Sequence, residues 1–160
     1  MIGAPGSGKT TVGTALAERL GVDFRDTDAD IEATAGKPVS EIFIDDGEPR
    51  FRELERAAVR DALAEHGGVL ALGGGAVLDP ATQELLAGHS VVYLQVGLSD
   101  AVKRVGLAAA RPLLVLNPRS RLRELMAERA PIYERLATIA VATDGRDPAD
   151  IVEEIVKALP

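Results

Sequence analysis

The chain has 160 residues, 46% of them hydrophobic, and a formal net charge of −7 from 18 basic and 25 acidic side chains. This size suits one domain with a sizeable core, and the acidic balance argues against a general role on nucleic acid or on a membrane surface. The absence of cysteine excludes disulfides and thiolate metal sites, and without a bilayer-spanning run or a signal peptide we expect a cytoplasmic protein.

The first element along the chain is a glycine-rich loop at residues 3–10, with the sequence Gly-Ala-Pro-Gly-Ser-Gly-Lys-Thr. It matches the pattern G-x-x-x-x-G-K-[ST] at every fixed position, and this pattern is typical of loops that bind nucleotide phosphates. Glycines let backbone N–H groups turn toward phosphate oxygens, and the following helix adds the positive end of its dipole. We expect Lys9 to reach the β- and γ-phosphates and the Thr10 hydroxyl to bind Mg²⁺. The alternative is a turn that caps an ordinary helix.

The structure expected around this loop is incomplete on one side. A helix over residues 11–20 is predicted from apolar residues at helical spacing, and it ends at Gly21. A buried strand should precede the loop, but only Met1 and Ile2 stand before it. We therefore expect the first strand to be missing here, and we expect about five to eight apolar residues upstream to supply it.

The rest of the chain alternates between predicted strands and helices, which favours a three-layer α/β fold around a parallel sheet. Short apolar or β-branched runs predict strands at residues 22–25, 69–72, 91–96 and 138–143. Helical spacing and capping residues predict helices at 28–34, 39–44, 49–66, 80–87, 99–105, 119–136 and 148–159. No internal repeat or linker divides the chain, so we expect a single domain over residues 1–160.

Two aspartates follow the predicted strand at 22–25, in the sequence Asp26-Thr27-Asp28. Spaced by two on an extended backbone, their side chains project on the same side at the carboxyl end of a strand, where open parallel sheets bind ligands. One carboxylate there can hold Mg²⁺ through water, and the other can accept the proton of an attacking hydroxyl. Helix capping by Thr27 or Asp28 is the alternative, and it is compatible with catalysis.

Further candidates for a substrate site lie in the middle of the chain. Arg52 and Glu55 stand one helical turn apart, so the glutamate can hold the guanidinium toward a substrate carboxylate, and a solvated ion pair is the alternative. Three glycines follow the predicted strand at 69–72, where their backbone N–H groups can approach a ligand with no side chain in the way. A plain turn is the other interpretation of these glycines.

The segment 106–118 contains one charged residue, Arg111. If the segment closes as a lid, it brings this arginine to the phosphates and excludes water, so that hydrolysis does not compete with transfer. A surface helix or a partner contact is the alternative. On the next predicted helix, Pro131 can kink the backbone and turn Arg129 inward, although this arginine alone is equally consistent with a structural role.

Taken together, the motifs resemble the shikimate kinase family over the whole chain. The motifs that carry the resemblance, in order, are Gly3-to-Thr10, Asp26-Thr27-Asp28, Phe51-Arg52-x-x-Glu55, Gly73-Gly74-Gly75-Ala76, Arg111-Pro112-Leu113-Leu114 and Arg129-Ala130-Pro131-x-Tyr133. The resemblance implies the nucleoside monophosphate kinase fold, ATP and Mg²⁺. It also implies phosphorylation of the 3-hydroxyl of shikimate, giving shikimate 3-phosphate and ADP, in chorismate and aromatic amino-acid biosynthesis. We expect a monomer.

The resemblance also implies individual roles for the motif residues. ATP phosphates would be bound by residues 3–11, namely Gly3, Ala4, Pro5, Gly6, Ser7, Gly8, Lys9, Thr10 and Thr11. Mg²⁺ would be held by Thr10 and, through water, by Asp26. Asp28 would bind the shikimate hydroxyls and orient or deprotonate the attacking one, with Lys9 and the lid arginine Arg111 completing the catalytic set.

In the same family, the shikimate carboxylate is clamped by residues that correspond here to Arg52 and Arg129, and the backbone of Gly73, Gly74 and Gly75 lines that pocket. Glu55 would hold Arg52 in place. The positions that flank the adenine and the phosphates correspond to Arg104, Arg146 and Pro148. The substrate-binding region would span about residues 28–60 and the lid about residues 106–118.

Two alternatives to this function stay open. The first is a related small-molecule kinase such as gluconate kinase, which would share the loop, the sheet and a lid. The second is a non-catalytic nucleotide-binding fragment, because in the fold that the resemblance implies the missing strand is central. Its absence would expose the edges of two neighbouring strands and leave Gly3 unanchored.

Overall fold

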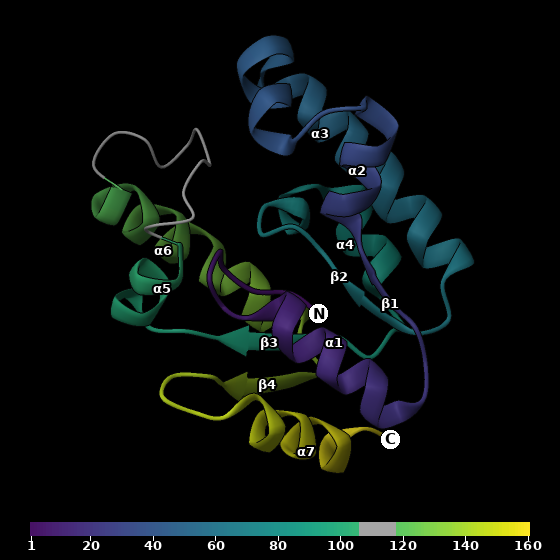
Figure 1. Cartoon of the computed structure of the whole chain (residues 1–160), viewed down its shortest axis with the longest axis vertical. Coiled ribbons are helices and arrows are strands. Elements are labelled where there is room, and N and C mark those ends of the chain that lie inside the picture. Colours follow the sequence, from purple (N-terminus) through teal and green to yellow (C-terminus); the bar gives the residue numbers. More distant parts are fainter. Residues whose placement is uncertain (106–117) are drawn as a thin grey trace.

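The computed structural model describes residues 1–105 and 118–160 and has helices on both faces of parallel strands (Figure 1). The strands are β1 (Phe24–Asp26), β2 (Val69–Ala71), β3 (Val92–Gln95) and β4 (Ile139–Ala142). The helices are α1 (Lys9–Leu20), α2 (Thr27–Ala35), α3 (Val39–Glu65), the 3₁₀ turn η1 (Ala76–Leu78), α4 (Pro80–Leu86), α5 (Leu98–Val105), α6 (Pro118–Leu136) and α7 (Pro148–Ala158). Arg111 and the rest of the predicted lid up to residue 117 lie outside the described residues.

The first two residues join two pairs of strands. β1 pairs with β2, and β3 pairs with β4, in parallel in both cases. Between these pairs, the Leu72 N–H donates to the Met1 carbonyl at 3.1 Å, and the Ile2 N–H donates to the Val92 carbonyl at 2.8 Å. The expectation that Gly3 would be unanchored is wrong, because Ile2 is only 1% exposed and ties the loop to the middle of the sheet. The neighbouring ends of β2 and β3 line, together with Met1, a cavity of about 200 Å³.

Two hydrophobic clusters cover opposite faces of the strands, which confirms the three-layer fold. On one face, α1 and α7 pack against β3 and β4 through residues that include Leu16, Val92, Leu94, Val141, Ile151 and Ile155. On the other face, α3, α4 and α6 contribute to a cluster that includes Ile2, Val59, Leu72, Leu86, Tyr93 and Tyr133. Successive residues of β3 therefore point to opposite layers, and both sides of the strand are apolar, as in a buried parallel sheet.

Helix α3 has a break at Gly47, where the sequence predicts a separation between two helices. Its φ of 84° and ψ of 164° lie outside the helical region, and Pro49 follows two residues later. Glycine reaches this backbone conformation without the strain that a Cβ would introduce. A third hydrophobic cluster, with Ile31, Ile42 and Phe51 at its centre, packs α2 against α3 on both sides of this break. Among the helices of the described residues, none combines the length and apolar character needed to cross a bilayer.

Candidate active site

The glycine-rich loop wraps around the start of α1. Gly6 and Gly8 have φ values of 80° and 93°, so both need the left-handed conformation that glycine adopts readily. A Cβ added to Gly6 would lie 2.9 Å from the Ala101 carbonyl oxygen, which shows how closely the loop packs on α5. The Lys9 ammonium donates to the carbonyls of Gly3 and Ala4 at 2.9 and 3.1 Å. The loop thus has the backbone form of an anion-binding site, with a cation held against it.

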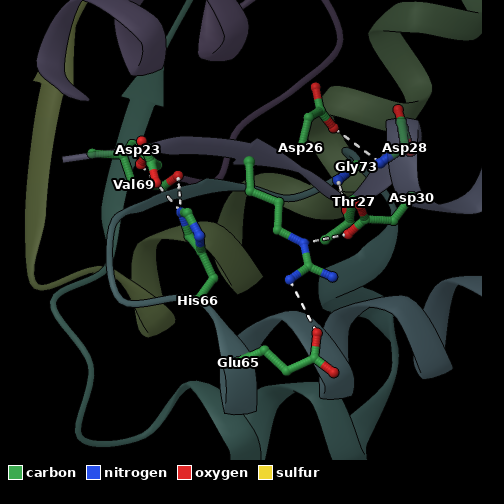
Figure 2. Close-up of polar contacts among 10 residues, drawn as sticks. Asp23, Asp26, Thr27, Asp28, Asp30, Glu65, His66, Val69 and Gly73 are labelled. Carbon is green, nitrogen blue, oxygen red and sulfur yellow. Dashed lines mark hydrogen bonds and ion pairs between the residues drawn. The ribbon is translucent and has the colours of Figure 1, made fainter. Parts of the chain in front are cut away.

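Strand β1 delivers two carboxylates to this loop. Asp26 ends the strand and caps α2, because its carboxylate accepts the Asp28 N–H at 2.9 Å (Figure 2). The Thr10 hydroxyl donates to Asp26 at 3.4 Å, so the two predicted metal-binding groups are neighbours. Lys9, Thr10, Asp26 and Asp28 line one cavity of about 210 Å³ together with Gly73 and Gly74. The helix cap is thus Asp26 and not Thr27 or Asp28 as the capping alternative predicts, and the same residue also lines the cavity at the loop.

The oxygen pair of Thr10 and Asp26 fits Mg²⁺ better than a transition metal. Within residues 1–105 and 118–160, no group of three or more His, Cys, Asp or Glu side chains is placed to hold a metal ion. Magnesium usually takes only one or two protein oxygens and fills its remaining positions with phosphate oxygens and water. A hydroxyl and a carboxylate beside a phosphate loop provide that minimal donor set.

Burial raises the pKa of the Asp26 carboxyl, although the hydrogen bond from the Asp28 N–H opposes the shift. We therefore expect Asp26→Asn to raise the melting temperature of the ligand-free protein at neutral pH. Because the folded pKa lies above the ordinary value of 3.8, the associated stability is complete below that value and is lost as the pH rises through the folded pKa. Asparagine removes the charge and retains a capping oxygen for α2. The gain should be present in thermal unfolding at neutral pH and disappear below the ordinary pKa.

The control for this measurement is Asp23→Asn, because Asp23 is a nearby exposed carboxylate. Its melting temperature at neutral pH should match that of the wild type. An unchanged or lower melting temperature for Asp26→Asn at neutral pH would show that the hydrogen bonds of the ionised carboxylate outweigh its desolvation.

Each of the three glycines after β2 lies close to a different side chain of the predicted substrate site. A Cβ added to Gly73 would lie 2.8 Å from Oδ1 of Asp28, and one added to Gly74 would lie 3.3 Å from an Nη of Arg129. At Gly75 the corresponding distance to an Nη of Arg52 is 2.5 Å. Any larger residue would therefore push into the space that these charged groups share. The structure brings together the glycines, the aspartate and both arginines, as the sequence predicts, and their roles stay predictions.

Glu55 is a buried carboxylate that pairs with one of the two arginines and lies within electrostatic range of the other. Arg52 donates to Glu55 at 2.7 Å, and the Glu55 side chain is only 5% exposed. Burial raises the pKa of Glu55, although Arg52 opposes the shift. Arg129 is 4% exposed, and its Nε is a buried side-chain polar atom without a hydrogen-bond partner among the described residues. Buried polar atoms normally find partners, so the Arg129 Nε is a donor that a ligand with a hydrogen-bond acceptor could satisfy.

The residues predicted to flank the adenine lie near the end of β4. An Nη of Arg104 donates to the Gly6 carbonyl at 3.0 Å and approaches the Thr143 hydroxyl at 3.5 Å. Arg146 is turned toward the Ala142 carbonyl and toward α7. Pro148 is the first residue of α7. Arg104 thus links the phosphate loop to β4, and the contacts of these three residues with adenine stay predictions.

Two buried side chains that are not among the predicted site residues hold the triglycine loop. The Gly73 N–H donates to the Thr27 hydroxyl at 3.4 Å, and the Tyr133 hydroxyl donates to the Gly74 carbonyl at 2.5 Å. Tyr133 stands one helical turn after Arg129, and that spacing is a signal that sequence reasoning can use. Nothing in the sequence distinguishes Thr27 from an ordinary helix cap.

The fold and the cavity define a class of protein. The phosphate loop follows two residues that are hydrogen-bonded between β2 and β3, and the carboxylates of Asp26 and Asp28, at and just after the end of β1, line the same cavity as the loop. This is the arrangement of P-loop kinases with the nucleoside monophosphate kinase fold, which transfer a phosphoryl group from ATP to a small acceptor.

Comparisons with known proteins identify the family within that class. Residues 5–160 match the family model of shikimate kinase. Shikimate kinase of Salinispora tropica is 63% identical over 160 residues, which cover 100% of this chain and 96% of that protein. The Thermobifida fusca shikimate kinase is 61% identical over 100% of this chain and 93% of its own length. The structure of Acinetobacter baumannii shikimate kinase in complex with shikimate has a TM-score of 0.93 at 35% identity, over 98% of this chain and 88% of that chain. The chain belongs to the shikimate kinase family.

Proposed function

We propose that this chain transfers the γ-phosphoryl group of ATP to the 3-hydroxyl of shikimate, giving shikimate 3-phosphate and ADP. The observation that carries the proposal is the single cavity lined by Lys9, Thr10 and Asp28. It provides one space for the transferred group, the nucleophile and its base. Family membership and the shikimate-bound relative support the choice of acceptor.

Catalysis at this site would rest on positioning and on neutralising charge. The backbone N–H groups of the loop and Lys9 hold the phosphates. Magnesium, held by Thr10 and through water by Asp26, would neutralise charge on the β- and γ-phosphates. Asp28 accepts a hydrogen bond from the attacking hydroxyl and takes its proton as the new O–P bond forms and ADP leaves. The part assigned to Arg111, neutralising charge from the lid, stays a prediction.

The arginine pair supports an acceptor that carries a carboxylate. Arg52 and Arg129 both approach the triglycine loop, and Glu55 is the buried carboxylate beside them. A substrate carboxylate would give the Arg129 Nε the acceptor that it lacks in the described structure. Charge-assisted contacts of this kind are stronger than neutral hydrogen bonds, so the clamp would both bind and orient the ring.

We expect Arg52→Ala to raise the KM for shikimate by about 10- to 100-fold, because the desolvated carboxylate of the bound substrate loses a charge-assisted hydrogen-bond partner. The KM for ATP should stay unchanged, since Arg52 does not line the phosphate-loop cavity. Steady-state kinetics with each substrate varied in turn measure both values. The matched control is Arg50→Ala, because Arg50 lies on the same helix, is 55% exposed and pairs only with Glu53 among the described residues. An unchanged kcat/KM for shikimate in Arg52→Ala would reject the clamp.

A turnover assay separates the proposal from its alternatives. The purified chain should release ADP from ATP and Mg²⁺ only when shikimate is present. Turnover with gluconate alone would favour the related kinase, and nucleotide binding without turnover would favour a non-catalytic module. We further propose a monomeric enzyme of the cytoplasm, and analytical ultracentrifugation tests the oligomeric state.

A further inference from the structure

Tyr133 is the largest of the fully buried side chains among the described residues, and the mechanism above gives it no task. Its ring packs against the ring of Tyr93, with the centroids 5.1 Å apart. Its hydroxyl donates to the Gly74 carbonyl across 59 residues of sequence. Burial raises the pKa of Tyr133 to about 12, so the hydroxyl keeps its proton at neutral pH and remains a donor.

The contact helps to fix the orientation of the peptide between Gly74 and Gly75, which lies in a turn that the Ala76 N–H closes on the Gly73 carbonyl at 3.1 Å. Gly74 and Gly75 have no side chains, so no Cβ limits the rotation of this peptide. In a trans peptide the N–H points opposite to the carbonyl. Holding the Gly74 carbonyl on Tyr133 therefore turns the Gly75 N–H away from α6. Gly75 is also the glycine whose added Cβ would collide with Arg52.

The same hydroxyl lies next to the second arginine of the proposed clamp. Arg129 stands four residues before Tyr133 on α6, which puts both side chains on one face of the helix. An added Cβ on Gly74 would lie 3.3 Å from an Nη of Arg129, so the carbonyl-bearing residue touches both side chains. The Arg129 charge also opposes part of the upward shift of the Tyr133 pKa, which places the two groups within electrostatic reach.

We propose that Tyr133 is a positioning residue for the carboxylate end of the acceptor. Its hydroxyl sets the orientation of the Gly74–Gly75 peptide and holds the Arg129 guanidinium beside it, so that backbone N–H and guanidinium face the same anion. This role rests on the proposed function, because it assumes that the acceptor is shikimate. It requires no contact between Tyr133 and the substrate.

The test is Tyr133→Phe, which retains the ring and its packing on Tyr93 and removes only the hydroxyl. The KM for shikimate should rise about tenfold, because the Gly74 carbonyl loses its buried donor and the peptide loses its tether. The KM for ATP should not change. The matched control is Tyr93→Phe. It removes the hydroxyl from the other ring of the same aromatic pair and leaves the bond between Tyr133 and Gly74 in place.

Thermal unfolding with each ligand provides a second measurement that does not depend on turnover. Shikimate should raise the melting temperature of Tyr133→Phe less than that of the wild type, while a non-hydrolysable ATP analogue should raise both equally. A lower melting temperature with an unchanged KM for shikimate would show a purely structural role and overturn the proposal. If the wild type did not phosphorylate shikimate, the proposed function would fail first and the Tyr133 role with it. An active wild type with no shikimate-specific change in Tyr133→Phe would reject the Tyr133 role alone.

Discussion

Replacing Asp28 with asparagine should lower kcat by about 10²- to 10⁴-fold, the usual contribution of a general base. Asparagine has the same shape and can accept a hydrogen bond, but it cannot take the proton of the attacking hydroxyl. The KM for ATP should be unchanged, because the phosphate loop and Lys9 remain in place. Single-turnover measurements with saturating ATP and shikimate report the transfer step directly.

The control for this prediction is Asp30→Asn on the same first turn of α2. Asp30 accepts from Arg25 at 2.8 Å, and Figure 2 shows its carboxylate turned toward that ion pair, whereas Asp28 lines the cavity. Arg25 also donates to Glu65 at the end of α3, so Asp30→Asn tests the packing of the helices and not the chemistry. A wild-type kcat for Asp28→Asn would remove Asp28 from the role of base.

Replacing Lys9 with methionine should lower kcat/KM for ATP by about 10²- to 10³-fold, the size of effect seen when a preorganised charge-stabilising donor is removed. The ammonium donates to the Gly3 and Ala4 carbonyls, and we expect it to exchange these acceptors for phosphate oxygens when ATP binds. Methionine keeps much of the side-chain length and loses both interactions. Steady-state kinetics measure the effect, and a melting curve in the absence of nucleotide reports the loss of the contacts within the loop.

Lys157→Met is the matched control, because Lys157 is an exposed lysine in the last turn of α7. It should leave both the kinetics and the melting curve as in the wild type. If Lys9→Met kept its kcat/KM for ATP, the loop would bind phosphate through its backbone alone, and the transition-state role of the ammonium would be excluded.

The alternation of strands and helices was predictable from the sequence, because apolar runs and helical spacing encode burial directly. The residues at which each strand and helix begins and ends were less predictable. The first strand lies at Phe24–Asp26 and not at 22–25, because pairing with β2 sets its register and local preference is weaker than such pairing. The place of Ile2 in the sheet could not be inferred, since two residues are too few to show a period and the partners of Ile2 lie about ninety positions away.

The candidate site was predictable where a motif carries its own chemistry or where topology brings groups together. Asp26, Asp28 and the triglycine loop converge because the carboxyl ends of neighbouring parallel strands meet at one edge. The contacts of Thr27 and Tyr133 with the triglycine loop were not predictable, because they join residues that stand 46 and 59 positions apart in the sequence. The roles of the converging residues are still predictions, and the substitutions described above test them.

Helix α3 belongs to two hydrophobic clusters at once. Its Phe51 packs in the cluster shared with α2, and its Val59 packs under the sheet with Tyr133. Arg52 and Glu55 stand between these two anchors. A cavity created by a substitution in either cluster can shift the helix segment that both clusters share. The loss of stability caused by a substitution in one cluster then depends on the residue present in the other. We therefore expect substitutions in the two clusters to be non-additive in their effect on the position of the Arg52 guanidinium, even though the altered side chains do not touch the acceptor.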